Sequence, residues 1–355
     1  MKLISGLFSG GKNIVGLDIG SRALKLVELA DTPGGYKLKS LAWVPLEKGI
    51  IEKGLLNDSV ILTKKIKELF KKAKCKTPQV ATALSGHSIV INKANFRTMD
   101  EEELLQVISD EAGEYLPFDN IENVAFDIHV LGAHPDNPEQ IEVIIAAAGK
   151  ETVAEYRTAI EGAGCRVAIM DADSFALETA YEENYEFGDE DIVALINIGA
   201  SLTNINIVRG NQSVFTRNIL MGGNAITEMI QARMGISFDE AETLKIEKLG
   251  RELVGDTDIL DYLEPIFAEI ERSIDFFSSS VSLAFIKKVL ICGGCARLPG
   301  IADALAQRLR CETELFDPFQ AVEYDQSVWS PEYLDEMRSI AVIGVGLALR
   351  RIEDL

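Results

Sequence analysis

The chain of 355 residues is long enough for two domains with insertions, and its 47% hydrophobic composition can fill a large interior. Its net charge of −21 argues against broad contact with nucleic acid phosphates or anionic lipid headgroups, because both require basic surface. Five cysteines spread over this length do not form a disulfide framework, which favours a reducing compartment, and no apolar run reaches the roughly 18 residues of a membrane span.

The N-terminal half begins with a leader, residues 1–12, which we expect to be cytoplasmic and to pack on the body or remain disordered rather than touch a membrane. Alternation and helical spacing then predict strands at 14–18, 23–29 and 36–44, a helix at 60–74 and a strand-rich stretch at 79–94. A compact α+β insertion follows at about 88–165. Its expected elements are a helix at 101–116 stopped by Pro117, strands at 124–131 and 141–147, and a helix at 151–161.

From residue 192 the initial pattern starts again. The predicted strands are 192–196, 204–208 and 212–217, and a helix opens at Gly222 and Gly223. Residues 237–282 are mostly helical and acidic, and a final helix at 341–350 returns to the first domain. This repeated hairpin plus strand indicates an internal duplication with two facing half-sites.

Three short glycine-bearing segments follow runs of apolar and β-branched residues. They are residues 16–21, 197–201 and 292–300. A buried strand that ends in a tight glycine turn presents backbone N–H groups, and such nests suit phosphate oxygens. Two similar hairpins and a third glycine loop therefore predict a nucleotide clamped between two similar domains.

The order of these segments resembles that of the actin, heat-shock chaperone and sugar kinase superfamily, whose signatures are phosphate-one, connect-one, phosphate-two, adenosine and connect-two. The matching segments are 18–21 with Lys25, 170–177, 197–201, 291–300 and 340–346. Within this superfamily the chain most resembles the PilM family of type IV pilus assembly proteins, and FtsA second. The resemblance covers essentially the whole chain.

The resemblance implies an α/β, actin-like two-domain fold, with duplicated mixed sheets around an interdomain nucleotide cleft and an α+β insertion of the FtsA and PilM type. The expected divisions are a first domain at 13–190, with the insertion at about 88–165, a second domain at 191–338, with a helical insertion at about 237–282, and a C-terminal helix at 339–355.

The resemblance also implies ATP and Mg²⁺ as ligands, with Asp18 as the magnesium ligand through water. The candidate nucleotide-binding residues are Gly20, Ser21, Lys25, Gly199, Ala200, Ser201, Thr203, Gly222, Gly223, Asn224, Glu242, Lys245, Gly293, Gly294 and Arg297. Glu242 and Lys245 match a Glu-x-x-Lys helix motif that contacts ribose and adenine, and their spacing places both on one helix face. For Lys25, which would reach the nucleotide phosphates, a solvated strand lysine is the slightly less favoured alternative.

Hydrolysis is in doubt from the sequence. Phosphate-two usually carries an aspartate where this chain has Asn197, so one carboxylate that would help to place metal or water is missing. Connect-one supplies Asp173 as the remaining candidate base, which has to reach the attacking water in a suitable charge state. We therefore expect at most a weak ATPase.

Two other motifs point to different chemistry and are rejected. Residues 6–12 have P-loop spacing but lack the Ser or Thr after the lysine, and no strand precedes them. Cys292 and Cys295 have zinc or redox spacing without a second pair, so they are expected to pack as small apolar side chains.

The resemblance further implies a partner, the N-terminal cytoplasmic tail of the inner-membrane protein PilN, captured in a groove beside the α+β insertion. The helix at 101–116 is expected to form one wall, with the acidic residues 100–103 attracting a basic tail; the alternative is that this helix packs only on its own sheet. Other pilus machine components and a second copy of the chain are further candidate partners. The protein is expected to be cytoplasmic and peripheral at the inner membrane, without nucleic acid or its own membrane span.

Two alternatives remain open at this point. An FtsA-like division filament protein is the first, but such proteins continue into a C-terminal amphipathic membrane helix, for which we expect no counterpart after Leu355. A small-molecule kinase of the same fold is the second, but no substrate-binding signature is recognisable. Fractionation discriminates the first, since an FtsA-like protein anchors itself to lipid.

Overall fold

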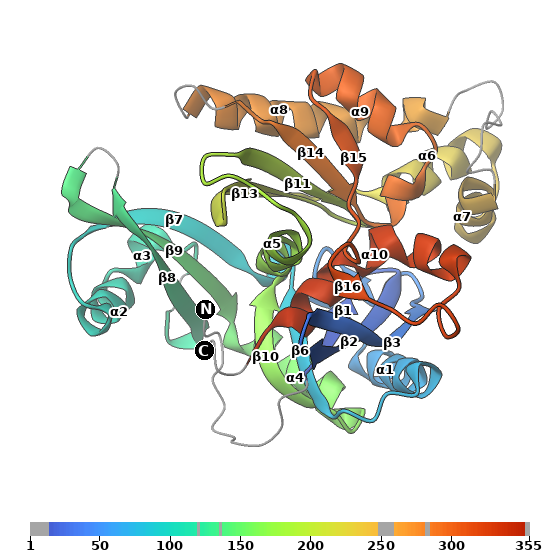
Figure 1. The fold of residues 1–355 in the computed structure, drawn as a ribbon, viewed down its shortest axis with the longest axis horizontal. Helices are drawn as coiled ribbons and strands as arrows, with labels where there is room; N and C mark the ends of the chain where they lie inside the picture. Colours follow the sequence, from blue (N-terminus) through green and yellow to red (C-terminus); the bar gives the residue numbers. More distant parts are fainter. Residues whose placement is uncertain (1–13, 119–120, 135–136, 248–258, 281–284, 352–355) are drawn as a thin grey trace.

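The computed structural model describes residues 14–118, 121–134, 137–247, 259–280 and 285–351. Two large β-sheets are arranged around the helices α5 (Asp173–Asn184) and α10 (Pro331–Leu349), which lie between them (Figure 1). A smaller three-stranded sheet projects to the left in Figure 1. The predicted leader at 1–12 and the P-loop-like segment at 6–12 lie outside the described residues.

The first sheet has six strands in the order β10-β6-β1-β2-β3-β16. Their bounds are β1 (Val15–Ile19), β2 (Ala23–Thr32), β3 (Gly35–Pro45), β6 (Gln79–Leu84), β10 (Arg166–Ala172) and β16 (Val322–Glu323). Strands β1, β2 and β3 pair antiparallel, whereas β6 pairs parallel with β1 and with β10. The predicted strands of this region are therefore confirmed, with small shifts of their ends.

Helices α1 (Ser59–Ala73) and α4 (Lys150–Gly162) pack on the first sheet. The α1 helix begins where the Asp58 carboxylate accepts a hydrogen bond from the Ile61 N–H at 2.9 Å, which satisfies one of the free amides of the first turn. Its apolar stripe of Leu62, Ile66 and Leu69 is fully buried, as a spacing of three and four residues requires. A two-stranded ribbon, β4 (Ile51–Glu52) and β5 (Leu55–Leu56), and the short helix η1 (Gly86–Ser88) complete this region.

The second sheet repeats the first three strands of the first. Its order is β13-β12-β11-β14-β15, with β11 (Ile192–Ile198), β12 (Thr203–Arg209), β13 (Gln212–Ile219), β14 (Lys288–Cys292) and β15 (Thr313–Leu315). Strands β11, β12 and β13 pair antiparallel, and β14 continues the sheet parallel to β11. The predicted duplication of hairpin plus strand is thus present in the structure.

In the described part of the chain, four helices and two short helical turns accompany the second sheet. They are α6 (Gly223–Met234), α7 (Phe238–Glu247), η3 (Ile259–Leu263), α8 (Glu264–Ser280), η4 (Gly294–Arg297) and α9 (Ile301–Leu309). Buried residues of the sheet and of these helices form one continuous apolar core. A further core joins β11 and β14 to α5, α10 and the first sheet, so the two sheets are fixed to each other at this side.

Helix α10 and its neighbours approach each other too closely for a side chain at two glycines. A Cβ atom on Gly16 of β1 would lie 2.0 Å from the carbonyl oxygen of Gly344, and one on Gly346 would lie 1.7 Å from that of Ala176. Glycine is required there because the contacted atoms are backbone. The helix also begins ten residues before the predicted start at 341, because Ser330 caps it by accepting from the Tyr333 N–H and Pro331 occupies the first turn.

The third sheet, in the order β7-β9-β8, consists of β7 (Val90–Arg97), β8 (Val124–His134) and β9 (Asn137–Gly149). The predicted single helix at 101–116 is wrong in one respect: it is broken into α2 (Glu101–Asp110) and α3 (Ala112–Tyr115), because Glu111 leaves helical geometry at φ −107° and ψ 17°. A short helix, η2 (Ile121–Asn123), leads into β8. Leu104 and Ile108 of α2 are fully buried against this sheet.

Candidate functional site

The first glycine hairpin lies at the end of β1. The Gly20 N–H donates to the carbonyl of Ala23 at 3.1 Å, which closes the turn. Asp18 and Lys25 face each other across β1 and β2, and the Lys25 Nζ lies 3.0 Å from the Asp18 Oδ2. Both side chains are largely buried, with exposed fractions of 15% and 16%. Lys25 is therefore paired with Asp18, the residue that the sequence predicts to be a magnesium ligand.

The second hairpin touches the first. It is closed by the Gly199 N–H, which donates to the carbonyl of Leu202 at 2.9 Å. The Ser201 hydroxyl donates to the Ser21 hydroxyl at 2.7 Å, although 180 residues separate them. Thr203, another predicted ligand, is buried and donates to the carbonyl of Met221 at 2.9 Å, so its hydroxyl holds the sheet to the next loop.

A third loop is built on the second hairpin. The Gly223 N–H donates to the carbonyl of Gly199 at 2.9 Å, and the Asn224 N–H donates to the carbonyl of Ala200 at 2.6 Å. A Cβ atom on Gly222 would lie 2.5 Å from the Gly199 carbonyl oxygen, so this approach requires glycine. The buried Oδ1 of Asn224 has no hydrogen-bond partner among the described residues. We call the contact of residues 20–21, 199–201 and 222–224 the hairpin junction.

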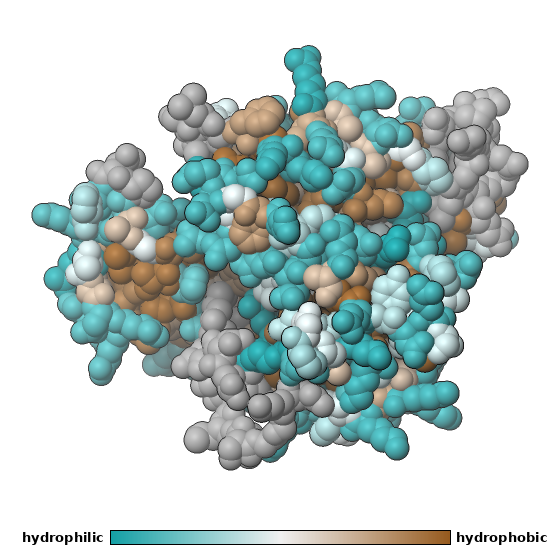
Figure 2. All heavy atoms as spheres, viewed as in Figure 1, coloured by the Kyte–Doolittle hydropathy of each residue, from teal (hydrophilic) through white to brown (hydrophobic). Residues whose placement is uncertain are grey.

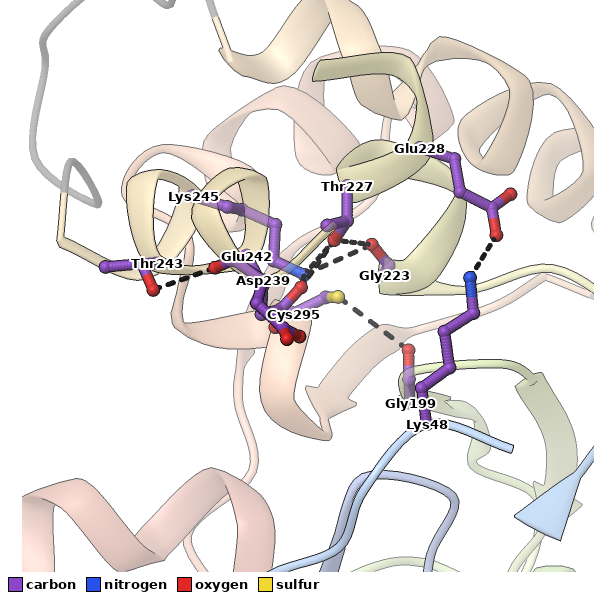
Figure 3. Close-up of polar contacts among 10 residues, drawn as sticks. All are labelled: Lys48, Gly199, Gly223, Thr227, Glu228, Asp239, Glu242, Thr243, Lys245 and Cys295. Atoms are coloured by element: carbon purple, nitrogen blue, oxygen red, sulfur yellow. Dashed lines mark hydrogen bonds and ion pairs between the residues drawn. The ribbon is translucent and has the colours of Figure 1, made fainter. Parts of the chain in front are cut away.

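A buried polar network joins the hairpin junction to α7 (Figure 3). The Lys245 ammonium donates to the carbonyl of Gly223 at 3.1 Å and to the Thr227 hydroxyl at 2.9 Å, and it lies 2.7 Å from the Glu242 Oε2. The Thr227 hydroxyl also hydrogen-bonds the Glu242 carboxylate. The predicted helical face of Glu242 and Lys245 is confirmed, and it points at the start of α6.

The late glycine loop packs against the second hairpin. Gly293 has φ 91°, and a Cβ atom there would lie 2.4 Å from the carbonyl oxygen of Ile198. A Cβ atom on Gly294 would meet nothing within 4 Å, so the space beside it is open. Arg297 is directed to α10 instead, where its Nη1 lies 3.9 Å from the Glu336 Oε1 and its side chain is 39% exposed.

Asp173 is the first residue of α5, and its Oδ1 is buried without a hydrogen-bond partner in the described chain. Desolvation, together with the negative charges of Asp18 and Asp171, raises the pKa of this carboxyl from 3.8 to about 7. Asp173 is therefore close to half-protonated near neutral pH. Its neighbour Asp171 is neutralised differently, by the Arg350 Nε at 2.6 Å.

No group of three or more His, Cys, Asp or Glu side chains that could hold a metal ion occurs within the described ranges. A magnesium ion would thus need other ligands besides Asp18. Cys292 and Cys295 are free and buried, and burial raises the pKa of both thiols, which fits apolar packing rather than metal or redox chemistry.

Sequence reasoning did not single out three residues that join the two halves beside the hairpin junction: Arg22, Lys48 and Phe238. The Lys48 Nζ lies 3.0 Å from the Glu228 Oε1 and 3.9 Å from the centre of the Phe238 ring. The guanidinium of Arg22 lies 5.5 Å from the same ring. The position of Arg22 next to Ser21 was the one sequence signal that could have indicated these residues. Nothing in the sequence pairs Lys48 with Glu228, which lies 180 positions away.

Comparison with known proteins identifies relatives over nearly the whole chain. A family model described as type IV pilus assembly protein PilM matches residues 16–352. The chain is similar to the solved structure of a PilM-PilN type IV pilus biogenesis complex, with a TM-score of 0.85 and 29% identity, covering 95% of this chain and 98% of that one.

Two more distant solved structures share the fold. The ethanolamine utilization protein EutJ from Carboxydothermus hydrogenoformans matches with a TM-score of 0.58 and 16% identity, covering 96% of this chain and 90% of that one. MreB 5 of Spiroplasma citri, bound to AMPPNP, matches with a TM-score of 0.51 and 11% identity, covering 95% of each chain. The predicted actin-like fold is confirmed by these similarities. Among the described helices, none is both long enough and apolar enough to cross a membrane.

Proposed function

The chain belongs to the type IV pilus assembly protein PilM family, and from this premise we propose that it is an actin-like component of the pilus assembly machine that binds ATP at the hairpin junction and captures the N-terminal tail of a PilN protein. The partner follows from the similarity to a PilM-PilN complex. The family match favours this role over that of an FtsA-like filament protein. Among the described residues, no feature of the site favours a kinase function.

The observation that carries the nucleotide proposal is the direct meeting of two glycine hairpins, with Ser201 and Ser21 2.7 Å apart. Hairpin amides and hydroxyls on two facing turns suit the oxygens of one polyphosphate. The buried oxygens Asn224 Oδ1 and Asp173 Oδ1 lack partners within the described chain, which is expected of groups that a ligand or its water satisfies. The open space beside Gly294 and the Glu242 and Lys245 network fit a nucleoside on the other side of the junction.

Magnesium fits this site only together with phosphate oxygens and water, since Asp18 is already paired with Lys25. When bound, the ion neutralises phosphate charge. With nucleotide bound, Lys25 would have two anionic partners, the Asp18 carboxylate and the phosphates. We propose that this chain's own residues bind and orient the nucleotide rather than turn it over rapidly, because Asn197 lacks a carboxylate and Asp173 is close to half-protonated near neutral pH.

For the tail we propose a position different from the predicted wall at 101–116, because the apolar side chains Leu104 and Ile108 already pack on their own sheet. A cavity of about 160 Å³ lies between β8, α5 and the turn before β13, and Leu131, Ile144 and Glu178 are among the residues that line it. It has room for a side chain of the tail, and β8 is an edge strand that an extended peptide can join. Figure 2 shows apolar surface over the three-stranded sheet, beside largely hydrophilic surroundings.

Two carboxyl groups, Glu178 and Glu182, line this cavity together with the Arg350 guanidinium, and burial raises the pKa of both carboxyls. A tail with a basic residue next to apolar ones would suit this wall, because a bound cation favours the ionised form of these carboxyls. Binding such a tail would hold the protein peripherally at the inner membrane, on its cytoplasmic side.

Thermal unfolding of the full chain with and without ATP and Mg²⁺ tests the nucleotide proposal. Binding stabilises the folded state by mass action, so we expect a higher melting temperature with millimolar ATP, and a markedly smaller shift for Asp18→Ala. The matched control is Asp189→Ala, which removes an exposed aspartate elsewhere. A wild-type protein with no thermal shift and no heat of ATP binding would contradict the proposal.

A further inference from the structure

Four side chains bridge the two halves of the molecule at one side of the hairpin junction. Lys48 forms an ion pair with Glu228 at 3.0 Å, and its ammonium stands 3.9 Å from the centre of the Phe238 ring. Arg22 approaches the same ring, at 5.5 Å from its centre. We call Arg22, Lys48, Glu228 and Phe238 the latch. Figure 3 shows Lys48 reaching Glu228 of α6 next to the network of Thr227, Glu242 and Lys245.

The first half of the latch is attached to the first hairpin. Arg22 directly follows Ser21, and its carbonyl accepts a hydrogen bond from the Leu46 N–H at 2.8 Å. This bond holds the segment that carries Lys48 beside the hairpin. Movement of the first hairpin therefore carries both cations with it.

The other half of the latch lies on α6, which carries Glu228, and on α7, which carries Phe238 as well as Glu242 and Lys245. Phe238 is the first residue of α7, four positions before Glu242 and seven before Lys245. Residues with this spacing share one face of a helix. The ring that the two cations contact thus lies on the same face as the two residues proposed to flank the nucleoside, at the end nearer the first hairpin.

The latch differs in kind from the contacts that fix the two sheets elsewhere. Near α5 and α10 the halves share a fully buried apolar core, which is costly to separate. The latch consists of charged and aromatic groups, and its ion pair is accessible to water, with exposed fractions of 41% for Lys48 and 55% for Glu228. Exposed ion pairs are weak, so the molecule can open at the latch while its core remains intact.

We propose that the latch retains the nucleotide: the two cations and the Phe238 ring hold the halves together over the hairpin junction, and nucleotide leaves when this contact parts. The inference rests on the proposed function, since it requires a nucleotide at the junction. Phe238 is in this role a positioning residue, because it acts through the closure of the two halves.

Release of a fluorescent nucleotide from the full chain measures this directly. The protein is loaded with N-methylanthraniloyl-ATP and Mg²⁺, and release is followed in a stopped-flow instrument after adding excess ATP. From the usual strength of cation–π contacts, we expect Phe238→Ala to release the nucleotide about tenfold faster, and Phe238→Tyr to keep the wild-type rate. Lys48→Ala, a change at the surface that leaves the core intact, should accelerate release by a factor of about three to ten.

The matched control is Lys72→Ala, which removes a lysine 5.4 Å from the Trp43 ring, a cation–π contact outside the latch. Its release rate should equal that of the wild type, and the melting temperatures of nucleotide-free Lys48→Ala and wild type should agree. A wild-type rate in both Phe238→Ala and Lys48→Ala overturns the latch and leaves the nucleotide site standing. Equal acceleration by Lys72→Ala also overturns it. A wild-type protein that does not bind the labelled nucleotide overturns the nucleotide proposal itself, and the latch with it.

Discussion

Replacing Lys245 with methionine should destabilise the second half of the molecule, because it strands a carboxylate. Lys245 is 7% exposed and satisfies three acceptors, while its partner Glu242 is 17% exposed at the side chain. Breaking a fully buried pair by removing one partner costs about 3–5 kcal/mol. Since Glu242 keeps some access to water, we expect a loss of about 2–3 kcal/mol in the free energy of unfolding. Methionine retains the apolar stem, so little of this loss comes from packing.

The stranded charge can be removed in turn. In the double variant Lys245→Met with Glu242→Gln, the neutral amide no longer needs a cation, so about 1–2 kcal/mol of the loss should return. The matched control is Lys287→Met, which breaks an exposed ion pair with Asp191 at 2.7 Å and should cost at most about 1 kcal/mol.

Urea unfolding at 25 °C, followed by circular dichroism and by fluorescence, measures these changes. Circular dichroism follows both sheets. The tryptophans report mainly on the first half, because Trp43 lies in β3 and Trp329 lies just before α10, and both pack against the same apolar cluster. In Lys245→Met, the dichroism transition should therefore move to lower urea concentration than the fluorescence transition. If Lys245→Met costs no more than Lys287→Met, or if the double variant is less stable than the single one, the interpretation of this network is refuted.

Three further outcomes follow from the packing and the titrating groups. Gly346→Ala should lower the free energy of unfolding by about 3 kcal/mol or more, since its Cβ would lie 1.7 Å from the backbone oxygen of Ala176. If Gly346→Ala is as thermally stable as the exposed control Gly188→Ala, this prediction is wrong. Burial and the Glu182 charge raise the pKa of Glu178 from 4.5 to about 8, so the wild type loses stability as pH rises from about 4.5 to 8. Between pH 6 and pH 8.5, the stability of Glu178→Gln should therefore increase by roughly 2 kcal/mol relative to that of the wild type. A pH-independent difference between the two proteins in denaturant titrations would contradict the raised pKa of Glu178. Steady-state ATP turnover should remain well below about 10 per second, because Asn197 supplies no carboxylate; rapid turnover that Asp18→Ala abolishes would show that the site is a catalyst.

The sequence predicts the parts of this site that depend on local patterns. A run of buried strand residues followed by Gly20 or Gly199 specifies a tight turn, and both turns are present. The cross-strand pair of Asp18 and Lys25 follows from hairpin register, in which these two positions face each other. The i, i+3 spacing of Glu242 and Lys245 likewise gives their common face.

Contacts between distant segments could not be predicted in the same way. The bond between Ser21 and Ser201 depends on how the two sheets pack around α5 and α10, which no local pattern specifies. Thr203 illustrates the converse: its place in the motif suggests a ligand contact, whereas its buried hydroxyl is used by the Met221 carbonyl. The break at Glu111 was missed because helical periodicity continues across it.

The early start of α10 was predictable in principle. Ser330, Pro331 and Glu332 form a typical helix start, with a capping hydroxyl, a proline in the first turn and an early acidic side chain. The helix was expected only from 341 because the apolar stretch begins there. The assignment of domain boundaries remains a prediction.

We expect ATP to act as a conformational ligand, so that nucleotide and tail favour the same state of the protein, and one measurement tests this most directly. Calorimetry of the full chain with a synthetic N-terminal PilN peptide, with and without saturating ATP and Mg²⁺, gives the coupling between the two ligands. We expect ATP to tighten peptide binding by a factor of about 5 or more, and the peptide to tighten ATP binding by the same factor, as linkage requires. Equal peptide affinity in both conditions would contradict the claim.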